Sequence, residues 1–361
     1  MSGATNEYNV IDLFCGAGGL SYGFVQAGYN VIIGVDNDKA ALKTFEQNHP
    51  NGKGLALDLF DENFIMELDK WVAGRQIDVV VGGPPCQGFS LTGKRDSDDK
   101  RNQLFKSMFL VLDKYSPKAI VIENVPGLKV LYGGCYYNLI IQEFEKRKYH
   151  WEQKEMYAPE YGIPQIRKRL IFIATRYDVT KILHPKAIIN KSENYVTTEE
   201  AISDLPSLEN GENELFFPYQ DTKLFDYAKE MRKNSKGIYN HVPTRHTDLV
   251  VSVISQVPEG GNHKDLPKGV GESRRFNEAW TRYHRKRPSK TIDTGHRNHF
   301  HYQYNRIPTV RENARLQSFP DKFIFCGTRT EQNRQVGNAV PPKLGFYIAQ
   351  AIKEQLSKWK K

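Results

Sequence analysis

Cysteine is scarce in this 361-residue sequence, and long apolar runs are missing altogether. The four cysteines, Cys15, Cys86, Cys135 and Cys326, form no CxxC pair, which argues against a disulfide framework and a zinc cluster. No stretch of 18 apolar residues could span a bilayer, and the polar start MSGATNEYN is unlike a signal peptide. With 39% hydrophobic and 26% charged residues, the composition excludes disordered and fibrous classes. We therefore expect a globular protein with free thiols, in a reducing compartment such as the cytoplasm.

Positive charge is present in excess, but it is confined to one part of the chain. The net charge is +9, and residues 223–306 contain 17 Lys+Arg against 8 Asp+Glu, so the rest of the chain sums to zero. Seven of the ten histidines fall in the same stretch. A localised basic surface is typical of polyanion binding, and a merely solubilising surface is the alternative.

The first half of the chain alternates between short apolar runs and longer mixed segments. The expected strands are 9–14, 31–36, 78–82, 119–123 and 170–174, with a possible further strand ending near Asp58. The expected helices are 20–27, 39–48, 63–73, 103–115 and 137–148. This pattern predicts an α/β fold with a doubly wound, mostly parallel sheet, which binds ligands outside the carboxyl ends of its strands.

The pattern fades after Thr175, where Gly and Pro punctuate the sequence and an acidic stretch precedes the basic one. It becomes regular again near the C-terminus, where 346–358 is expected to be a helix. We therefore predict a large domain over 1–184, a smaller domain over 185–304, and a return segment, 305–361, that completes the large domain.

The segment VIDLFCGAGGLSYGF (10–24) is typical of a strand, a glycine turn and a helix. Gly16, Gly18 and Gly19 would let a cofactor approach the backbone, although a tight turn is the plain alternative. The segment matches neither the GxGxxG fingerprint nor a Walker A loop. Asp36, at the end of the next expected strand, suits ribose hydroxyls, and Asp58 suits an exocyclic amine.

Other strand ends carry reactive side chains. In GGPPCQGFS (82–90) the prolines hold Cys86 rigidly, which favours a nucleophile over a buried small hydrophobe. In IVIENVPG (120–127) a strand ends in Glu123. In QIRKR (165–169) Arg167 and Arg169 alternate, so we expect them to point the same way, paired or bound to an anion.

Six motifs occur in order along the chain, namely DLFCGAGG (12–19), GGPPCQGFS (82–90), ENVPG (123–127), QIRKR (165–169), RENARLQSFPD (311–321) and QVGNAVPP (335–342). With them the sequence resembles the DNA (cytosine-5)-methyltransferases of the short prokaryotic restriction-modification type. The resemblance implies a Rossmann-like, S-adenosylmethionine-dependent methyltransferase fold. It also implies a target-recognition domain between QIRKR and RENARLQSFPD.

The resemblance assigns catalytic roles to four residues. Cys86 would add to carbon 6 of a flipped-out cytosine, so that carbon 5 can take the methyl group of S-adenosylmethionine. Glu123 would bind ring nitrogen 3 and the exocyclic amine, Arg169 the carbonyl oxygen, and Arg167 the neighbourhood of the loop and phosphates.

The expected cofactor contacts are Phe14, Gly16, Gly18, Gly19, Asp36, Asn37, Asp58, Leu59, Pro84, Leu104, Asn338, Ala339 and Val340. The family often has Ser where Ala339 stands and commonly has Glu where Asp36 stands. The expected DNA contacts are Gln87, Ser90, Thr92, Arg274, Arg275, Arg285, Arg287, Thr291 and Arg297. For any single basic residue among these, a solvated surface role is the alternative.

Two later features are expected to be structural. Arg311 and Arg315 lie four apart on a helix, and we expect an internal ion pair that packs the small domain. No metal is expected at His296, His299 and His301, because no cysteine or acid completes a ligand set.

Two other functions fit the fold, namely an RNA (tRNA) cytosine-5 methyltransferase and a catalytically idle DNA-binding homologue. The intact Cys86, Glu123 and Arg169 argue against the idle homologue. The insert of 120 residues, 185–304, favours DNA, because the RNA-directed relatives usually lack a sizeable recognition domain. The expected partners are double-stranded DNA and, acting separately, a cognate restriction endonuclease. We expect a monomer in a bacterial or phage-infected cell.

Overall fold

The computed structural model describes residues 8–61, 63–85, 104–179, 184–208, 214–270, 279–295 and 298–358. The chain divides into two compact units. Unit 1 comprises Met1–Tyr157, Lys168–Lys186 and Leu344–Lys361, and unit 2 comprises Ala158–Arg167 and Ala187–Lys343. No helix in the described part of the chain is long and apolar enough to cross a membrane.

Unit 1 is built on a seven-stranded sheet in the order β3-β2-β1-β4-β5-β7-β6. The strands are β1 (Asn9–Leu13), β2 (Asn30–Asp36), β3 (Lys53–Ala56), β4 (Val79–Gly82), β5 (Ala119–Asn124), β6 (Tyr149–Tyr157) and β7 (Lys168–Arg176). The first five strands pair in parallel, and β7 runs antiparallel to both β5 and β6. The strand order reverses between β1 and β4, which confirms the predicted doubly wound, mostly parallel sheet.

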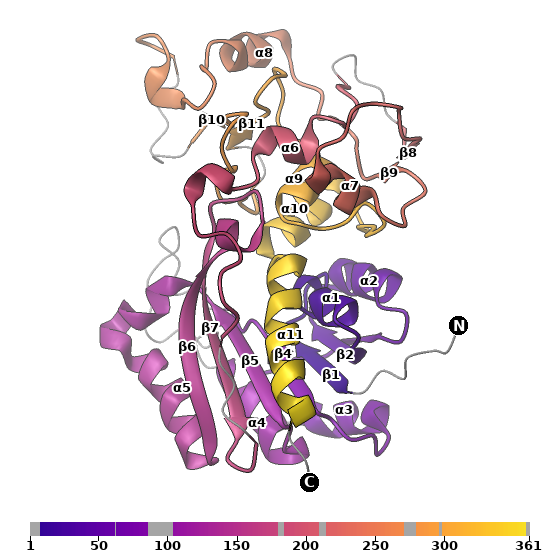
Figure 1. Cartoon of the computed structure of the whole chain (residues 1–361), viewed down its shortest axis with the longest axis vertical. Helices are drawn as coiled ribbons and strands as arrows, with labels where there is room; N and C mark the ends of the chain where they lie inside the picture. The colour runs from indigo at the N-terminus through magenta and orange to yellow at the C-terminus, as the bar shows by residue number, and fades with distance from the viewer. Residues whose placement is uncertain are drawn as a thin grey trace. The chain divides into compact units, whose positions relative to one another are not determined.

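Helices cover both faces of the sheet. The helices of unit 1 are α1 (Gly19–Gln26), α2 (Lys39–Asn48), α3 (Phe64–Val72), α4 (Phe105–Tyr115), α5 (Cys135–Lys146) and α11 (Pro342–Lys358). The apolar sides of α3, α4 and α5 share one buried core with the strands. On the other side, α11 packs against α1, since Gly345 touches the carbonyl group of Leu20 (Figure 1). Burial on both faces explains why these strands are continuous apolar runs.

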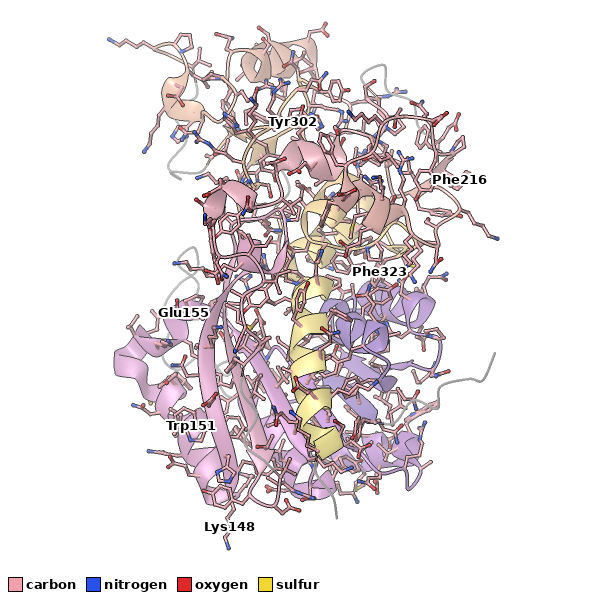
Figure 2. All side chains as sticks on the ribbon, viewed as in Figure 1. Lys148, Trp151, Glu155, Phe216, Tyr302 and Phe323 are labelled. Atoms are coloured by element: carbon pink, nitrogen blue, oxygen red, sulfur yellow. The ribbon has the colours of Figure 1, made fainter. Side chains whose placement is uncertain are left out.

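Strand β6 has no counterpart in the sequence prediction. Its sequence, YHWEQKEMY, is mostly polar, and only Tyr149 and Met156 are buried. Because β6 is an edge strand, charged side chains such as Glu155 lie at the surface (Figure 2). An edge strand of this kind lacks the apolar run that identifies the central strands.

Unit 2 consists of short elements joined by long irregular segments. Its helices are α6 (Thr198–Ile202), α7 (Asp226–Arg232), α8 (Asp248–Ser255), α9 (Val310–Leu316) and α10 (Arg329–Asn338). Its strands form two small pairs, β8 (Phe216–Phe217) with β9 (Ile238–Tyr239), and β10 (Thr281–Arg282) with β11 (His299–Phe300). Because these helices and strands are short, they contribute few backbone hydrogen bonds. Much of the stability of unit 2 therefore depends on side-chain interactions.

A buried ion network occupies the interior of unit 2. The guanidinium of Arg315 donates to Asp321 at 2.7 and 2.8 Å and to Asp204 at 2.5 Å, and Arg315 and Asp321 are fully buried. Arg232 also binds Asp204, at 2.7 Å. The neighbouring Arg311 donates to three backbone carbonyl groups. The predicted internal ion pairing is therefore confirmed. Arg315 makes the short contacts, and Arg311 lies 3.9 Å from Asp321 while its hydrogen bonds go to backbone carbonyl groups.

The unit boundaries differ from the expected domain boundaries. Unit 2 takes in the short segment Ala158–Arg167, and its main segment begins at residue 187, close to the expected 185, and extends to Lys343, beyond the expected 304. The reason is that α9 belongs to the ion network, because Arg315 on α9 binds Asp204 near α6. Only Leu344 and the residues after it return to unit 1.

Candidate active site

The side chains of interest in unit 1 gather at the carboxyl edge of the sheet. The glycine turn follows β1, Gly83 and Pro84 follow β4, and Glu123 lies near the end of β5. Strand β7 is antiparallel, so its first residues lie at the same edge, and Glu123 is paired in register with Ile171. The strand order reverses between β1 and β4 at this edge, which is the position at which doubly wound sheets bind ligands.

Glu123 and Arg169 form the clearest functional pair in this edge. The Nε atom of Arg169 lies 2.7 Å from Oε1 of Glu123, and their side chains are 16% and 13% exposed. The two side chains are therefore largely, though not completely, shielded from water. A carboxyl group beside a guanidinium offers both an acceptor and a fork of donors to a planar, hydrogen-bonding ligand.

The turn after β4 packs directly against this pair. A Cβ atom added at Gly83 would lie 2.9 Å from Oε2 of Glu123, so only glycine leaves the carboxyl group its place. The side-chain amide of Asn124 donates to the carbonyl group of Pro84 at 3.3 Å. Asn124 was not among the predicted site residues, although ENVPG contains it. The turn that leads toward Cys86 is thus fastened to the strand that carries Glu123.

The glycine turn after β1 has the geometry of a small-molecule cradle. Phe14 and Gly16 have φ of 59° and 52°, and a Cβ atom at Gly16 would meet nothing within 4 Å. The carboxyl group of Asp36 accepts the Gly16 N–H at 2.8 Å and the Asp38 N–H at 2.9 Å. Burial raises the pKa of Asp36 above its ordinary value. The open space at Gly16 and the nearby acceptor oxygens fit a ligand with hydroxyl donors.

The other expected cofactor residues of unit 1 differ in exposure. Asn37 and Asp58 are exposed, and Asp58 accepts the Phe60 N–H at 3.0 Å. Leu59, Pro84 and Leu104 are buried. Their roles stay predictions, with Asn37 and Asp58 accessible to a polar ligand and the other three contributing apolar surface.

Gly18 provides a test of the cradle. Its φ of 85° lies in the left-handed region, and a Cβ atom there would overlap the ring of His49. We expect Gly18→Ala to lower the free energy of unfolding by roughly 3 kcal/mol, from backbone strain plus overpacking. The control is Gly74→Ala, where φ is 72° but nothing lies within 4 Å, so only about 1 kcal/mol should be lost. Equal losses in urea unfolding would show that the overlap with His49 has no effect.

The remaining candidates of the catalytic and cofactor sets lie in unit 2. Arg167 is 2% exposed, and its guanidinium donates to the carbonyl groups of Gly337 at 3.2 Å and Ala339 at 3.0 Å. Arg167 lies one residue before β7, which begins at Lys168, and the expectation that Arg167 and Arg169 point the same way stays a prediction. Arg167 positions the turn that contains Asn338, Ala339 and Val340.

Two glutamines missed by the sequence analysis complete this arrangement. The side-chain amide of Gln317 donates to the carbonyl groups of Val336 and Ala339. The side chain of Gln165 bonds to Gln317 and accepts the backbone N–H of Ile292 at 3.3 Å. Both glutamines are fully buried. Both glutamines belong to sequence motifs, QIRKR and RLQSFPD, which could have drawn attention to them. Glutamine by itself, however, does not indicate a buried side chain that holds two backbone segments together.

The expected DNA contacts that the structure describes are Arg285, Arg287 and Thr291. The guanidinium of Arg285 lies 3.1 Å from Glu259 and 3.9 Å from Glu199, so two acids already offset its charge. Arg287 is exposed, and the hydroxyl of Thr291 donates to the Ile166 carbonyl group at 2.5 Å. Of the two arginines, Arg287 is therefore the better candidate for binding a phosphate. The DNA-binding roles of Arg285, Arg287 and Thr291 stay predictions.

Several predicted residues lie outside the described part of the chain. They are Cys86, Gln87, Ser90, Thr92, Arg274, Arg275 and Arg297. His296 lies outside it as well, whereas His299 stacks on Tyr283 and His301 lies 3.7 Å from the buried Glu312.

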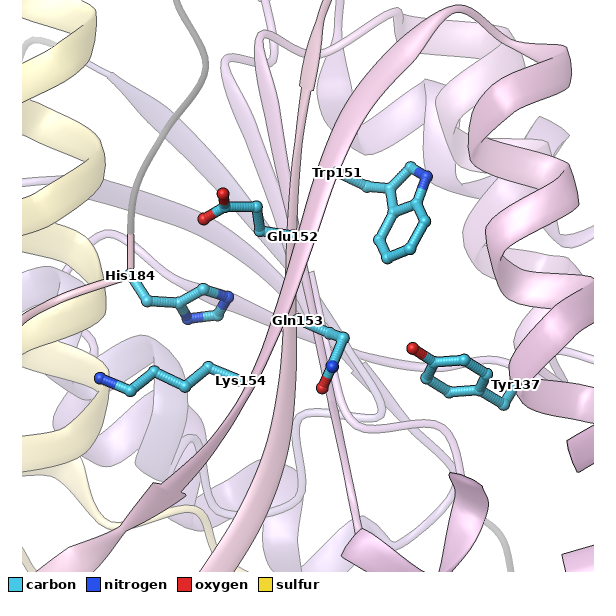
Figure 3. A pocket seen from close by; sticks show the side chains of 6 residues that line it. All are labelled: Tyr137, Trp151, Glu152, Gln153, Lys154 and His184. Atoms are coloured by element: carbon cyan, nitrogen blue, oxygen red, sulfur yellow. The ribbon is translucent and has the colours of Figure 1, made fainter. Parts of the chain in front are cut away.

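A shallow depression elsewhere on unit 1 has no comparable chemistry. It is lined by Tyr137, Trp151, Glu152, Gln153, Lys154 and His184 (Figure 3). Four of these are consecutive residues of β6, so their side chains point alternately to opposite faces of the edge strand. The lining groups therefore do not converge on one point.

The fold and the edge define the class of the protein. A doubly wound sheet with a glycine cradle, an acid–guanidinium pair and a proline-locked turn at its switch point is an α/β enzyme framework. The family model described as C-5 cytosine-specific DNA methylase matches residues 8–354. The chain belongs to that family and is a DNA (cytosine-5-)-methyltransferase.

Similar proteins agree with this assignment. The chain is 37% identical to the Type II methyltransferase M.DdeI of Desulfomicrobium norvegicum, over 97% of this chain and 88% of the relative. It is also 37% identical to the Type II methyltransferase M1.HphI of Haemophilus parahaemolyticus, over 95% of this chain and 86% of the relative. A solved structure described as a DNA modification methyltransferase encoded within a prophage (E. coli) matches with a TM-score of 0.78 and 27% identity. That match covers 97% of this chain and all of the other.

Proposed function

We propose that the enzyme methylates carbon 5 of a flipped-out cytosine in a specific DNA sequence through a covalent Cys86 adduct. The observation that carries this proposal is the Glu123–Arg169 pair, 2.7 Å apart, against the turn that leads to Cys86. Base flipping is required because carbon 6 of a stacked cytosine is out of reach of a protein nucleophile.

The adduct solves a specific chemical problem. Carbon 5 of cytosine is a weak nucleophile, and addition of the Cys86 sulfur to carbon 6 breaks the aromatic system and makes carbon 5 enamine-like. Glu123, in its acid form, gives a proton to ring nitrogen 3 as the sulfur–carbon bond forms, and it accepts from the exocyclic amine. Arg169 donates to the carbonyl oxygen. After methylation, carbon 5 loses its proton to water and the sulfur–carbon bond breaks, so that Cys86 leaves as a thiolate. Nitrogen 3 returns its proton to Glu123, which restores the aromatic ring.

The cofactor proposed for the glycine cradle is S-adenosylmethionine. Bound there, it supplies an electrophilic sulfonium methyl group. Asp36 would accept the ribose hydroxyls, and the backbone around Gly16 and Gly18 would hold the methionine end, in keeping with the open space at Gly16. Asp58, Leu59, Pro84 and Leu104 would surround the adenine side, and Asn338, Ala339 and Val340 are proposed to complete the site.

Unit 2 is proposed to be the target-recognition domain, and the exposed Arg287 is one of its candidate phosphate contacts. The names of the relatives, Type II methyltransferases, support a role as the modification enzyme of a restriction-modification system. The basic balance of residues 223–306 is consistent with a DNA-binding surface.

The Glu123–Arg169 pair gives a direct test of the proposed chemistry. We expect Glu123→Gln to lower kcat by about 10³ and Arg169→Met by about 10², since each removes a donor to the reacting base. Both act on one ring, so the double variant should lose far less than the product of the two effects. The control is Arg176→Met, at the far end of β7, where the guanidinium binds Asp178 at the surface. Multiplicative losses, or single variants as active as Arg176→Met, would contradict the roles given to the pair.

A further inference from the structure

Two buried glutamine amides join three backbone segments of unit 2. The segments are 165–167, 291–293 and 336–339. Neither glutamine, Gln165 or Gln317, has any solvent exposure. The amide nitrogen of Gln317 donates to the carbonyl groups of Val336 at 3.1 Å and Ala339 at 2.7 Å. Both carbonyl groups lie at the C-terminal end of α10, where a helix leaves its last carbonyl groups for partners outside it.

Gln165 continues the series of hydrogen bonds toward the second segment. Its amide nitrogen donates to the side-chain oxygen of Gln317, and it lies 3.4 Å from the carbonyl oxygen of Leu316. Its own side-chain oxygen accepts the backbone N–H of Ile292 at 3.3 Å. Hydrogen bonds therefore run without a break from Ile292 through the two glutamines to Ala339. We call this series the amide relay.

The amide relay can run in only one direction. The carbonyl groups of Val336 and Ala339 can only accept, so the NH₂ group of Gln317 has to face them. The oxygen of Gln317 then faces Gln165, whose NH₂ group donates to it. The oxygen of Gln165 is left for the backbone N–H of Ile292, which can only donate. Rotation of either amide by 180° would put two acceptors face to face and leave buried polar groups unpaired, so both amides are fixed in orientation.

The segments that the amide relay joins also touch directly. A Cβ atom added at Gly337, on α10, would lie 2.6 Å from the carbonyl oxygen of Asp293. The hydroxyl of Thr291 donates to the carbonyl group of Ile166 at 2.5 Å. Arg167 donates to the carbonyl group of Gly337 at 3.2 Å. A shift of any one segment must therefore displace the other two, because their packing leaves no slack.

Each end of the amide relay leads to a residue with a proposed ligand. Ile292 follows Thr291, a candidate DNA contact, and Ala339 belongs to the turn that is proposed to complete the cofactor site. We propose that Gln165 and Gln317 are positioning residues that couple these two places, so that the first ligand to bind orders the segment that meets the second. The inference rests on the proposed function, because it presumes that Thr291 meets DNA and that the turn meets S-adenosylmethionine.

A coupling of this kind is reciprocal and has a measurable size. If the cofactor product tightens the binding of DNA by some factor, DNA tightens the binding of the product by the same factor. Couplings between sites are typically roughly 5- to 150-fold, and we expect about tenfold here. Loss of the amide relay should lower the factor to about threefold, since the direct contacts between the segments remain.

The variant Gln165→Met removes the central link with a side chain of similar length. We expect S-adenosylhomocysteine to tighten the binding of a duplex that carries the mapped methylation sequence about tenfold in the wild type and about threefold in this variant. The KM values for both substrates should rise about fivefold while kcat changes by less than about twofold, because the amide relay acts on binding and not on the reacting base.

The matched control is Gln335→Met. Gln335 is also buried, on α10, and its amide donates to a backbone carbonyl group, that of Cys326, at 3.0 Å, but it is not part of the amide relay. This variant should keep the tenfold coupling of the wild type, about as large as before the change.

A double-variant cycle distinguishes a relay from separate packing effects. Gln317→Met should lose as much coupling as Gln165→Met, and the double variant should lose no more, because a series of hydrogen bonds interrupted once is interrupted throughout. Losses that multiply in the double variant would mean that the two glutamines act independently, which would overturn the inference.

An independent measurement needs no variant. In the wild type, S-adenosylhomocysteine alone should slow amide hydrogen exchange in the peptide that contains Ile292, and duplex DNA alone should slow it in the peptide that contains Ala339. Helix α8 of the same unit is the reference, and S-adenosylhomocysteine should leave its exchange unchanged.

The outcomes separate the inference from the proposed function. The inference would be overturned, and the proposed function left intact, if the wild type showed no coupling, if Gln165→Met kept all of it, or if Gln335→Met lost as much. Slowed exchange confined to the segment that meets the ligand would have the same meaning. A wild type that binds neither S-adenosylhomocysteine nor DNA would overturn the proposed function and the inference with it. If the glutamine variants do not fold, hydrogen exchange in the wild type decides.

Discussion

The Cys86→Ala variant is expected to transfer no methyl groups while it still binds DNA and S-adenosylmethionine. Without the sulfur no bond forms at carbon 6, and carbon 5 remains too weak a nucleophile to take the methyl group. The expected loss in rate is at least about 10⁴-fold, since removal of a covalent nucleophile leaves only positioning and electrostatic effects. Single-turnover transfer of labelled methyl groups to duplex DNA measures it, and gel retardation confirms that DNA still binds.

A matched control separates chemistry from packing. Cys326 is a partly buried thiol of unit 2, and Cys326→Ala should retain full activity. A denaturant-resistant protein–DNA complex should form with a duplex that carries 5-fluorocytosine, because carbon 5 then has no proton to lose. The thiolate mechanism would be contradicted if Cys86→Ala still methylated DNA. It would also be contradicted if Cys86→Ala still formed the denaturant-resistant complex with 5-fluorocytosine DNA.

The Arg315→Met variant is expected to lose about 3–5 kcal/mol of stability in unit 2. The side chain of Arg315 has no solvent exposure, and its removal leaves the buried carboxyl groups of Asp321 and Asp204 without their shared cation. At present the Arg315 guanidinium holds the pKa of Asp321 below its ordinary value, despite the opposing effect of burial. Urea unfolding followed by amide hydrogen exchange measures the loss and locates it in unit 2.

The control for this variant is an ion pair at the surface of the same unit. Lys229 and Asp226 pair on α7 with both side chains exposed, and Lys229→Met should leave the unfolding midpoint unchanged. Unfolding of Arg315→Met at the wild-type midpoint would mean that the network contributes no net stability. Protection lost only in unit 1 would mean that the network does not hold unit 2 together.

The sequence identified the central strands because burial on both faces requires continuous apolar residues. Strands β1, β4 and β5 lie within a residue or two of their expected ranges for this reason. Strand β6 was missed because an edge strand with one solvated side can be mostly polar. The antiparallel place of β7 was not predictable either, since an apolar run carries no direction, and it is this direction that brings Arg169 to Glu123.

The candidate site was predicted unevenly for a similar reason. Motifs identify residues whose chemistry is distinctive, such as Glu123 and the glycines of the β1 turn. They do not identify residues whose role is to hydrogen-bond to the backbone, such as Gln165 and Gln317. In the sequence, a buried glutamine of this kind cannot be told from a glutamine at the surface.

One assay tests the central claim most directly, namely that this enzyme methylates carbon 5 of cytosine in DNA. Labelled S-adenosylmethionine is offered with duplex DNA and tRNA side by side, and the label is mapped to the modified base. We predict label in DNA, as 5-methylcytosine within one short sequence, and none in tRNA. Label in tRNA alone would contradict the account, because unit 2 would then not be a DNA-recognition domain. Label in neither substrate, while DNA still binds, would also contradict it, because the protein would then be an idle homologue.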